Sequence, residues 1–357
     1  RIHKPLKAKI LKNLDKTIDE NQFILGEAVK SFEHKFSEYT NSKYTISCSS
    51  GTDAIELIIR ALGIGFGDEV ILPANTFIAT ALAVTRTGAK PVLVDNNDLY
   101  LIDYLLIEKK ITKKTKAIIG VHLYGQQANN LEIAKICKKY NLFYIEDAAQ
   151  AHGSLYKRKP PGTYGIAAAY SFYPGKNLGA WGDGGAITTN NKGLAKKLSY
   201  LRNWGSDQKY IHKETGFNSR LNTLQALVLS EKLNHINEWN QLRNEIALMY
   251  LDKLSEVGKI ILPEVTNFNE HVWHLFVIRT SNRKKFFQKL NSQGIELGIH
   301  YPLPIHKQQA YKKLNYNSKE FPKANDYSKR IVSLPIFPRM KKNEVNYVID
   351  KILNVYS

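Results

Sequence analysis

Hydrophobic and polar positions follow two alternating patterns along the first two thirds of the chain. Runs of apolar, β-branched and aromatic residues predict strands, and these runs lie at 43–50, 70–73, 91–95, 117–124, 143–149, 167–173 and 185–190. Stretches with apolar residues at helical spacing lie at 6–18, 26–39, 52–62, 76–87, 103–109, 130–140 and 191–204. Nearly continuous apolar strands separated by helices are typical of a mostly parallel sheet covered on both faces. We therefore expect a large α/β domain, with 185–190 as the odd antiparallel strand.

The pattern changes in the last third of the chain. In order, it predicts a polar loop at 209–216, a long helical region at 221–254, a strand at 271–280, a helix at 284–293, a proline-punctuated loop at 298–311 and a last helix at 344–355. Helices and one strong strand without the earlier alternation indicate a smaller α+β domain. We place the large domain at 1–240 and the small domain at 241–357.

Composition narrows the class of protein. The chain has 357 residues, a hydrophobic content of 43% and a formal net charge of +19. The lysines are dispersed and no nucleic-acid-binding motif is present, so we expect no nucleic acid partner. Cys48 and Cys137 form no CxxC pair, which suits a reducing compartment and implies no metal site. No stretch approaches the roughly 18 apolar residues of a membrane span, and we expect a soluble, cytoplasmic protein.

The turn from Ser49 to Asp53 joins a predicted strand to a predicted helix. The amides of Gly51, Thr52 and Asp53 would point outward from the positive end of that helix, where a phosphate binds readily. An ordinary helix cap explains the same residues, and without further signals it is the simpler interpretation.

Asp147 and Lys176 both follow predicted strands, and ligands bind at the carboxyl ends of strands in open α/β sheets. A lysine that forms a Schiff base and a carboxylate that pairs with a protonated ring nitrogen are the pattern of pyridoxal phosphate enzymes. Ser171 is a candidate to add a hydroxyl to the phosphate. Phe77 is a candidate to lie flat on the cofactor ring, although an aromatic residue of the core explains it nearly as well.

Two other phosphate-binding motifs are excluded. A P-loop requires Gly four residues before Gly-Lys and Ser or Thr after it, but Tyr170 and Asn177 occupy these positions. The glycine-rich segment GIGFG at 63–67 has the wrong spacing for a dinucleotide fingerprint and follows a predicted helix rather than a strand.

Several segments, in order along the chain, resemble the DegT/DnrJ/EryC1/StrS aminotransferase family: SSGTDAIELIIRALGIGFGDEVILPANTF, GAKPVLVD, IEDAAQAHG, SFYPGKNLGAWGDGGAI, LRNWG and GFNSRLNTLQALVL. The resemblance runs from about residue 5 to the C-terminus. It implies fold-type I, like aspartate aminotransferase, pyridoxal 5′-phosphate as cofactor, and transfer of an amino group to a nucleotide-linked keto-sugar. Some relatives carry His at the position of Lys176 and dehydrate a sugar instead, so Lys176 favours transamination.

The resemblance also assigns roles to individual residues. Lys176 corresponds to the lysine that binds the cofactor, Asp147 to the partner of its ring nitrogen and Gln150 to the neighbour of its phenolic oxygen. Gly51, Thr52 and Ser171 correspond to phosphate ligands, and Phe77 to the stacking aromatic residue. Asn218 resembles an asparagine that reaches the cofactor phosphate of a neighbouring subunit, which implies a homodimer with composite sites.

The C-terminal segments WHLFVIRTSNR and GIHYPLPIHKQQAY resemble the branch of the family that aminates C-3 of dTDP-3-keto-6-deoxyhexoses, with L-glutamate as the usual donor, for O-antigen, S-layer or other glycans. His300, Tyr301 and Tyr173 are then candidates for the sugar, although a rigid loop with packed aromatic residues explains His300 and Tyr301 equally well. Arg220 and Arg202 are candidates for the diphosphate. The alternatives are a UDP-linked 3-keto hexuronic acid, a C-4 keto-sugar, or a basic binding module without catalysis.

Overall fold

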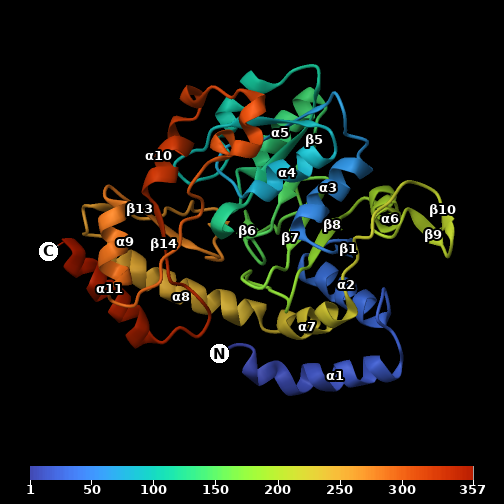
Figure 1. Ribbon diagram of the computed structural model, residues 1–357, viewed down its shortest axis with the longest axis horizontal. Helices are drawn as coiled ribbons and strands as arrows, with labels where there is room; N and C mark the ends of the chain where they lie inside the picture. Colours follow the sequence, from blue (N-terminus) through green and yellow to red (C-terminus); the bar gives the residue numbers. More distant parts are fainter. Residues whose placement is uncertain (357) are drawn as a thin grey trace.

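A seven-stranded sheet forms the centre of the larger part of the chain in the computed structural model, which describes residues 1–356 (Figure 1). Its strands lie in the order β1 (Tyr44–Cys48), β8 (Gly185–Thr189), β7 (Ala167–Ser171), β5 (Phe143–Asp147), β4 (Thr115–Val121), β2 (Glu69–Pro73) and β3 (Lys90–Val94). β8 pairs antiparallel with both of its neighbours, and the remaining pairs are parallel. The expected α/β class and the antiparallel strand are therefore confirmed.

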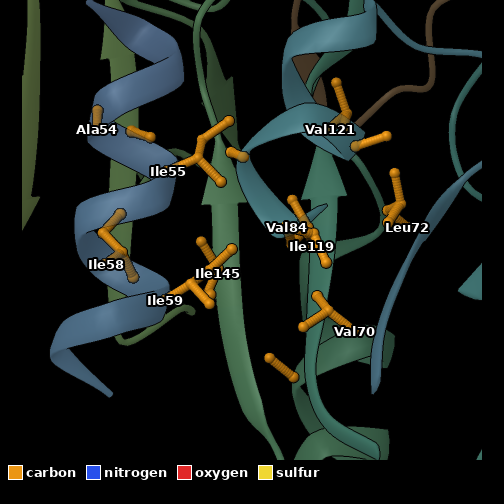
Figure 2. Close-up of a cluster of buried hydrophobic side chains, with 14 of the residues drawn as sticks. Ala54, Ile55, Ile58, Ile59, Val70, Leu72, Val84, Ile119, Val121 and Ile145 are labelled. Atoms are coloured by element: carbon orange, nitrogen blue, oxygen red, sulfur yellow. The ribbon is translucent and has the colours of Figure 1, made fainter. Parts of the chain in front are cut away.

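Helices cover this sheet because their buried apolar side chains pack against it. They are α2 (Glu27–Tyr39), α3 (Gly51–Ala61), α4 (Ile78–Arg86), α5 (Asn130–Tyr140), α6 (Lys192–Leu201) and α7 (Thr223–Leu233). α1 (Lys7–Asp19) instead packs on the outside of α7, where Ile10 contacts Val228. α3 shows the pattern clearly, because Ile55, Ile58 and Ile59 lie on one face at helical spacing and are buried. Figure 2 shows this face packed toward side chains of the sheet, among them Ile119 and Ile145. Burying one such side chain contributes about 1.5–3 kcal/mol to folding.

The C-terminal part has its own apolar cluster around a small antiparallel sheet in the order β11, β13, β14. Its elements are α8 (Ile236–Leu254), β11 (Ile260–Ile261), β13 (Phe276–Thr280), α9 (Arg283–Asn291), α10 (Pro322–Arg330), β14 (Ile331–Leu334) and α11 (Lys342–Tyr356). Members of this cluster begin at Ile246, in the middle of α8. We propose that the boundary between the two domains falls within α8, near residue 240. Ile305, Tyr311 and Tyr327 instead pack with the core of the large sheet.

Short elements complete the chain. They are two two-stranded ladders, β6 (Leu155–Tyr156) with β12 (Asn269–Glu270) and β9 (Ser206–Gln208) with β10 (Ile211–His212), and the 3₁₀ turns η1 (Lys4–Leu6), η2 (Tyr104–Leu106), η3 (Glu108–Lys110), η4 (Leu123–Gly125), η5 (Ile305–Lys307), η6 (Gln309–Leu314) and η7 (Ser318–Glu320). The β9–β10 hairpin projects from the body of the molecule (Figure 1). Within residues 1–356, no helix combines the length and apolar character that a membrane span requires.

Some sequence expectations were wrong in detail. The helix expected at 103–109 is two 3₁₀ turns, because seven residues are too few to offset the cost of nucleating an α-helix. The loop expected at 209–216 contributes to the β9–β10 hairpin, and the region 221–254 breaks into α7 and α8 at Asn234 and His235. The strand expected at 271–280 begins only at Phe276. The residues before it follow the loop after β4, to which Val272 and Leu275 donate backbone hydrogen bonds.

Candidate active site

A cavity of about 500 Å³ lies at the carboxyl edge of the large sheet. Because β1, β2, β4, β5 and β7 run in the same direction, the segments that follow them meet at this edge. The cavity is lined by most of the residues singled out in the sequence: Gly51, Thr52, Phe77, Asp147, Gln150, Ser171, Tyr173, Lys176, His300 and Tyr301.

Lys176 lies in the loop that leaves β7, where its amide donates to Tyr173 O at 2.9 Å. Burial lowers the pKa of Lys176 to about 8, and the nearby Asp147 carboxylate opposes this shift. A substantial fraction of the lysine is therefore a neutral amine near neutral pH. Lys176 Nζ has no hydrogen-bond partner among residues 1–356, so it is available to a ligand.

Asp147 ends β5 and is buried, with one protein donor on each carboxylate oxygen. Thr80 Oγ1 donates to Oδ2 at 2.8 Å, and the Ala149 amide donates to Oδ1 at 3.1 Å. Burial raises the pKa of Asp147, whereas these hydrogen bonds oppose that shift. A buried carboxylate with spare lone pairs is suited to pair with a cationic ring nitrogen.

Glu146 points to the opposite side of β5, as strand alternation requires. Its Oε2 lies 3.0 Å from His122 Nε2, and its Oε1 accepts the amides of Tyr164 and Gly165. Two adjacent carboxylates are thus separated, with Glu146 bound within the structure and Asp147 directed to the cavity.

The first turn of α3 approaches Ser171 closely. A Cβ atom on Gly51 would lie 2.7 Å from Ser171 Cβ, so only glycine fits there without a shift. Ser50 caps the helix and accepts the Asp53 amide at 3.1 Å, whereas the amides of Gly51 and Thr52 have no acceptor among the described residues. These two amides and the Ser171 hydroxyl form a site for a phosphate at a helix N-terminus.

Asp53, which we expected to contribute an amide to the phosphate site, does not line the cavity. Its amide is occupied by the Ser50 cap, and its carboxylate accepts hydrogen bonds from Ser49, Ser219 and Arg86. The physical reason is that α3 begins at Gly51, one residue before the expected start at residue 52, so that Ser50 is the N-cap and its side chain occupies the Asp53 amide.

Aromatic side chains form the other wall of the cavity. Phe77 is 49% exposed, and its ring centroid lies 5.3 Å from that of Tyr301. Gln150 accepts the Tyr124 amide at 2.7 Å and donates to Tyr301 Oη at 3.1 Å. Burial raises the pKa of Tyr301 to about 12, so its hydroxyl stays protonated and is free to donate to a ligand.

The structure does not bring Asn218, Arg220 or Arg202 into this cavity. Asn218 is exposed and accepts a hydrogen bond from Arg220 Nη2 at 2.6 Å. Arg202 pairs with Glu33 and donates to Ser47 O at 2.7 Å, which occupies it structurally. Arg202 is therefore no longer a candidate for the diphosphate.

Sequence reasoning missed several residues that line the cavity, among them Thr80 and His274. Thr80 holds Asp147 from the first turn of α4, and a threonine in a helix carries no signal of that role. His274 lines the cavity from the segment before β13. Its position inside the apolar run that predicts a strand at 271–280 gave it the appearance of a core residue.

The groups in this cavity fit pyridoxal 5′-phosphate, as judged by their chemistry. A buried amine with a lowered pKa, a buried carboxylate, a helix N-terminus with free amides and an exposed aromatic ring supply one partner for each part of that molecule. Lys176 would hold its aldehyde carbon, Asp147 its ring nitrogen, and Gly51, Thr52 and Ser171 its phosphate.

Comparisons with known proteins find similar sugar aminotransferases. The chain is 48% identical to the dTDP-3-amino-3,6-dideoxy-alpha-D-galactopyranose transaminase of Aneurinibacillus thermoaerophilus, over 96% of this chain and 94% of that protein. The solved structure of S. venezuelae DesV in complex with a ketimine intermediate has a TM-score of 0.97 and 40% identity, over 99% of this chain and 95% of that one. NtdA from Bacillus subtilis, solved with bound PMP as cofactor, has a TM-score of 0.90 and 34% identity, over 97% and 81%.

The family profile described as the DegT/DnrJ/EryC1/StrS aminotransferase family matches residues 4–353, which is nearly the whole chain. A match of this extent, together with relatives that share the fold at high identity, establishes the family, the enzyme class and the cofactor. The chain belongs to the DegT/DnrJ/EryC1/StrS aminotransferase family and is a pyridoxal phosphate-dependent sugar-nucleotide aminotransferase.

Proposed function

We propose that the enzyme transfers the amino group of L-glutamate to C-3 of a dTDP-linked 3-keto-6-deoxyhexose. The products are 2-oxoglutarate and a dTDP-3-amino-3,6-dideoxyhexose, a building block for glycans such as O-antigens or S-layer glycans. A relative with 48% identity is named for a product of this class. The observation that carries the sugar assignment is the charge of the cavity: among the described residues that line it, Lys176 is the one Lys or Arg. Such a wall suits a 6-deoxy sugar, which has no carboxylate.

The residues of the chain divide the chemistry between them. The cofactor, when bound, supplies an electron sink for the carbanion formed at the reacting carbon. Asp147 would keep the cofactor's ring nitrogen protonated, and Thr80 and the Ala149 amide hold the carboxylate in place for this role. Lys176 would hold the cofactor and, once the amino donor has displaced it, its amine would take the proton from the α-carbon of the donor and, in the second half-reaction, deliver a proton to C-3 of the sugar. Its lowered pKa suits this role, because only the neutral amine is a base. His300 and Tyr301 face the sugar.

A UDP-linked 3-keto hexuronic acid is the main alternative, and relatives at 38–40% identity are named for UDP-linked sugars. A uronate carboxylate in this cavity would require a cation. Asp147 and Asp183, by contrast, give the described wall two carboxylates. A C-4 keto-sugar is a third possibility for the same chemistry.

The test is a direct comparison of acceptors with the purified enzyme. The pyridoxamine phosphate form is mixed with dTDP-3-keto-6-deoxy-glucose, its galacto epimer and a UDP-linked 3-keto hexuronate, and the return of the visible absorbance of the lysine-bound cofactor is followed. We expect at least one dTDP-sugar to restore the absorbance far faster than the uronate. Faster reaction with the uronate would refute the assignment. Bleaching by L-glutamate tests the donor separately.

We also propose that two chains assemble with composite sites. Asn218 is exposed and outside the cavity of its own chain, and it forms a β-bridge with Asn203, which lies shortly before the β9–β10 hairpin. Ser219 is hydrogen-bonded to Asp53 at 3.0 Å, so the loop that carries Asn218 is tied to the N-terminus of α3. In this arrangement Asn218 and Arg220 contact the phosphate groups bound by the partner chain.

Subunit mixing tests the composite site. Lys176→Ala and Asn218→Ala are each expected to be nearly inactive alone, because each removes one half of every site. In a mixed dimer one site carries both substitutions and the other carries neither. Statistical exchange should therefore restore about a quarter of the wild-type activity, because half of the dimers are mixed and half of their sites are intact. Mixing that restores no activity, despite exchange seen by native mass spectrometry, would refute the proposal.

A further inference from the structure

The segment 299–302 carries two residues of the cavity wall, His300 and Tyr301. It belongs to no helix or strand, so its backbone lacks the regular hydrogen bonds of such elements. Among residues 1–356, one backbone group of this segment makes a hydrogen bond: the His300 carbonyl, which accepts from the Tyr124 hydroxyl. The position of this part of the wall therefore depends on a side chain from the turn after β4, far away in the sequence.

A second connection joins Tyr124 to Tyr301 through Gln150. Gln150 Oε1 accepts the Tyr124 amide at 2.7 Å, and Gln150 Nε2 donates to Tyr301 Oη at 3.1 Å. A backbone amide only donates, so it requires the oxygen of Gln150 on its side and leaves the NH₂ group facing Tyr301. Tyr124 therefore acts on Tyr301 from two directions. Its hydroxyl holds the carbonyl before Tyr301, and its amide orients the side chain that binds the Tyr301 hydroxyl.

Tyr124 is itself held in place by its surroundings. Its backbone φ is 61°, which is uncommon for a residue other than glycine and persists only where neighbouring groups fix it. Its carbonyl accepts the Leu275 amide at 3.3 Å, and its buried ring packs edge-on against Tyr100 with centroids 5.3 Å apart. Burial raises the pKa of Tyr124 well above its usual value, so the hydroxyl keeps its proton and remains a donor. Tyr124 thus offers a fixed donor to the segment 299–302.

Tyr124 does not line the cavity, so its effect on a ligand must pass through the residues that it holds. We infer that Tyr124 is a positioning residue for Tyr301: its hydroxyl and its amide together determine where the Tyr301 side chain stands on the cavity wall. Because the ring of Tyr301 lies beside that of Phe77, with centroids 5.3 Å apart, a displaced Tyr301 changes the shape of the aromatic wall. The consequence for the sugar rests on the proposed function, in which His300 and Tyr301 face that substrate.

Nuclear magnetic resonance of the enzyme with its cofactor tests the positioning without donor or sugar. Tyrosine is labelled with ¹³C at Cζ, and Tyr301→Phe identifies the Tyr301 resonance. Tyr124→Phe removes one hydroxyl and keeps the ring and the amide. We expect the Tyr301 resonance to shift or broaden in Tyr124→Phe, because the carbonyl before Tyr301 loses its donor. An unchanged Tyr301 resonance in this variant would overturn the inference.

Kinetics of the second half-reaction test the consequence for the substrate. The pyridoxamine phosphate form is mixed with increasing concentrations of whichever sugar nucleotide reacts fastest with wild type, so a wrong assignment of the sugar does not affect the test. Tyr124→Phe should raise the half-saturating concentration by about 2- to 10-fold, as expected for the loss of one hydrogen bond. The limiting rate should stay nearly unchanged, because Tyr124 does not hold Lys176.

Tyr100→Phe is the matched control, because it removes a hydroxyl from the same buried group of aromatic residues. The Tyr100 hydroxyl makes no hydrogen bond among the described residues. Both the Tyr301 resonance and the half-saturating concentration should therefore match wild type. If Tyr124 served folding alone, Tyr124→Phe would lower the limiting rate through loss of active enzyme, at an unchanged half-saturating concentration. That result would refute the positioning role.

A double-mutant cycle shows whether Tyr124 acts through Tyr301. In the background of Tyr301→Ala, Tyr124→Phe should lose most of its effect on the half-saturating concentration. An equal effect with and without the Tyr301 ring would contradict the inference. If Tyr301→Ala alone changed the half-saturating concentration, the inference would fail and the contact of Tyr301 with the sugar would stand. If Tyr301→Ala had no effect, that contact would fail and the inference with it.

Discussion

The lowered pKa of Lys176 can be measured through the pH dependence of cofactor capture. Burial shifts the pKa of Lys176 from 10.5 to about 8, a difference that corresponds to about 3 kcal/mol against the ammonium form. At pH 7.5 roughly a quarter of the lysine is then a neutral amine, whereas an ordinary lysine would be neutral in about one molecule in a thousand. Because only the neutral amine attacks an aldehyde, burial makes Lys176 reactive at neutral pH.

The direction in which Asp147 shifts the pKa of Lys176 gives a second, independent expectation. The Asp147 carboxylate favours the ammonium and so raises the pKa of Lys176, in opposition to burial. Asp147→Asn removes this charge, and the pKa of Lys176 should fall further below 8. One acceptor for Thr80 or the Ala149 amide is lost in the exchange, so thermal unfolding of the variant must be compared with that of wild type.

The assay is stopped-flow absorbance of cofactor-free enzyme mixed with excess pyridoxal phosphate between pH 6 and 10. The rate of capture should rise with pH and be half-maximal near pH 8 for wild type, and at lower pH for Asp147→Asn. Asp183→Asn is the matched control, because Asp183 also lines the cavity but does not shift the pKa of Lys176. A rate that rises through the whole range without an inflection, as an ordinary lysine with a pKa of 10.5 would give, or an inflection that moves to higher pH in Asp147→Asn, would refute this electrostatic description.

Two further predictions concern packing. Gly51→Ala should weaken affinity for pyridoxal phosphate, measured by equilibrium dialysis, because its Cβ would lie 2.7 Å from Ser171 Cβ, whereas Gly258→Ala projects into open space and should have no effect. Equal affinities would count against the phosphate site. Ile58→Ala should lower the free energy of unfolding, measured by urea denaturation, by about 2–5 kcal/mol, since the Ile58 side chain on α3 is fully buried (Figure 2). A loss below 1 kcal/mol would show that the core refills the space.

Residues that follow strands could be predicted from the sequence, because their position depends on local pattern alone. Asp147 and Ser171 end β5 and β7, and parallel strands deliver them to one edge. Period-two alternation also separated Asp147 from Glu146, which pairs with His122 in the core. These assignments required the position and direction of each strand. Hydrophobic runs give the positions, and the alternation of strands with helices indicates that the strands are parallel.

Residues whose role depends on distant contacts could not be predicted. His274 lies in an apolar run that reads as strand, but Trp273 adopts a φ of 46° and the run follows the loop after β4 until Phe276. The role expected for the Asp53 amide was wrong for a different reason. Either of two adjacent serines has a side chain able to cap the helix, and the backbone conformation places Ser50 at the N-cap of α3. α10 was missed because its polar sequence has no apolar stripe of sufficient length.

The reversal of the chain between β7 and β8 links the lysine to the phosphate site. β8 returns antiparallel between β7 and β1, so that Gly185 is paired with both Ser171 and Cys48. A Cβ atom on Gly185 would lie 2.3 Å from Ser50 O, which shows how closely β8 approaches the start of α3. Glycine at this crossing therefore lets the amides of α3 lie beside the Ser171 hydroxyl. The loop between β7 and β8 carries Lys176. The position of β8 between β7 and β1 therefore places Lys176 and the phosphate ligands at the same edge of the sheet.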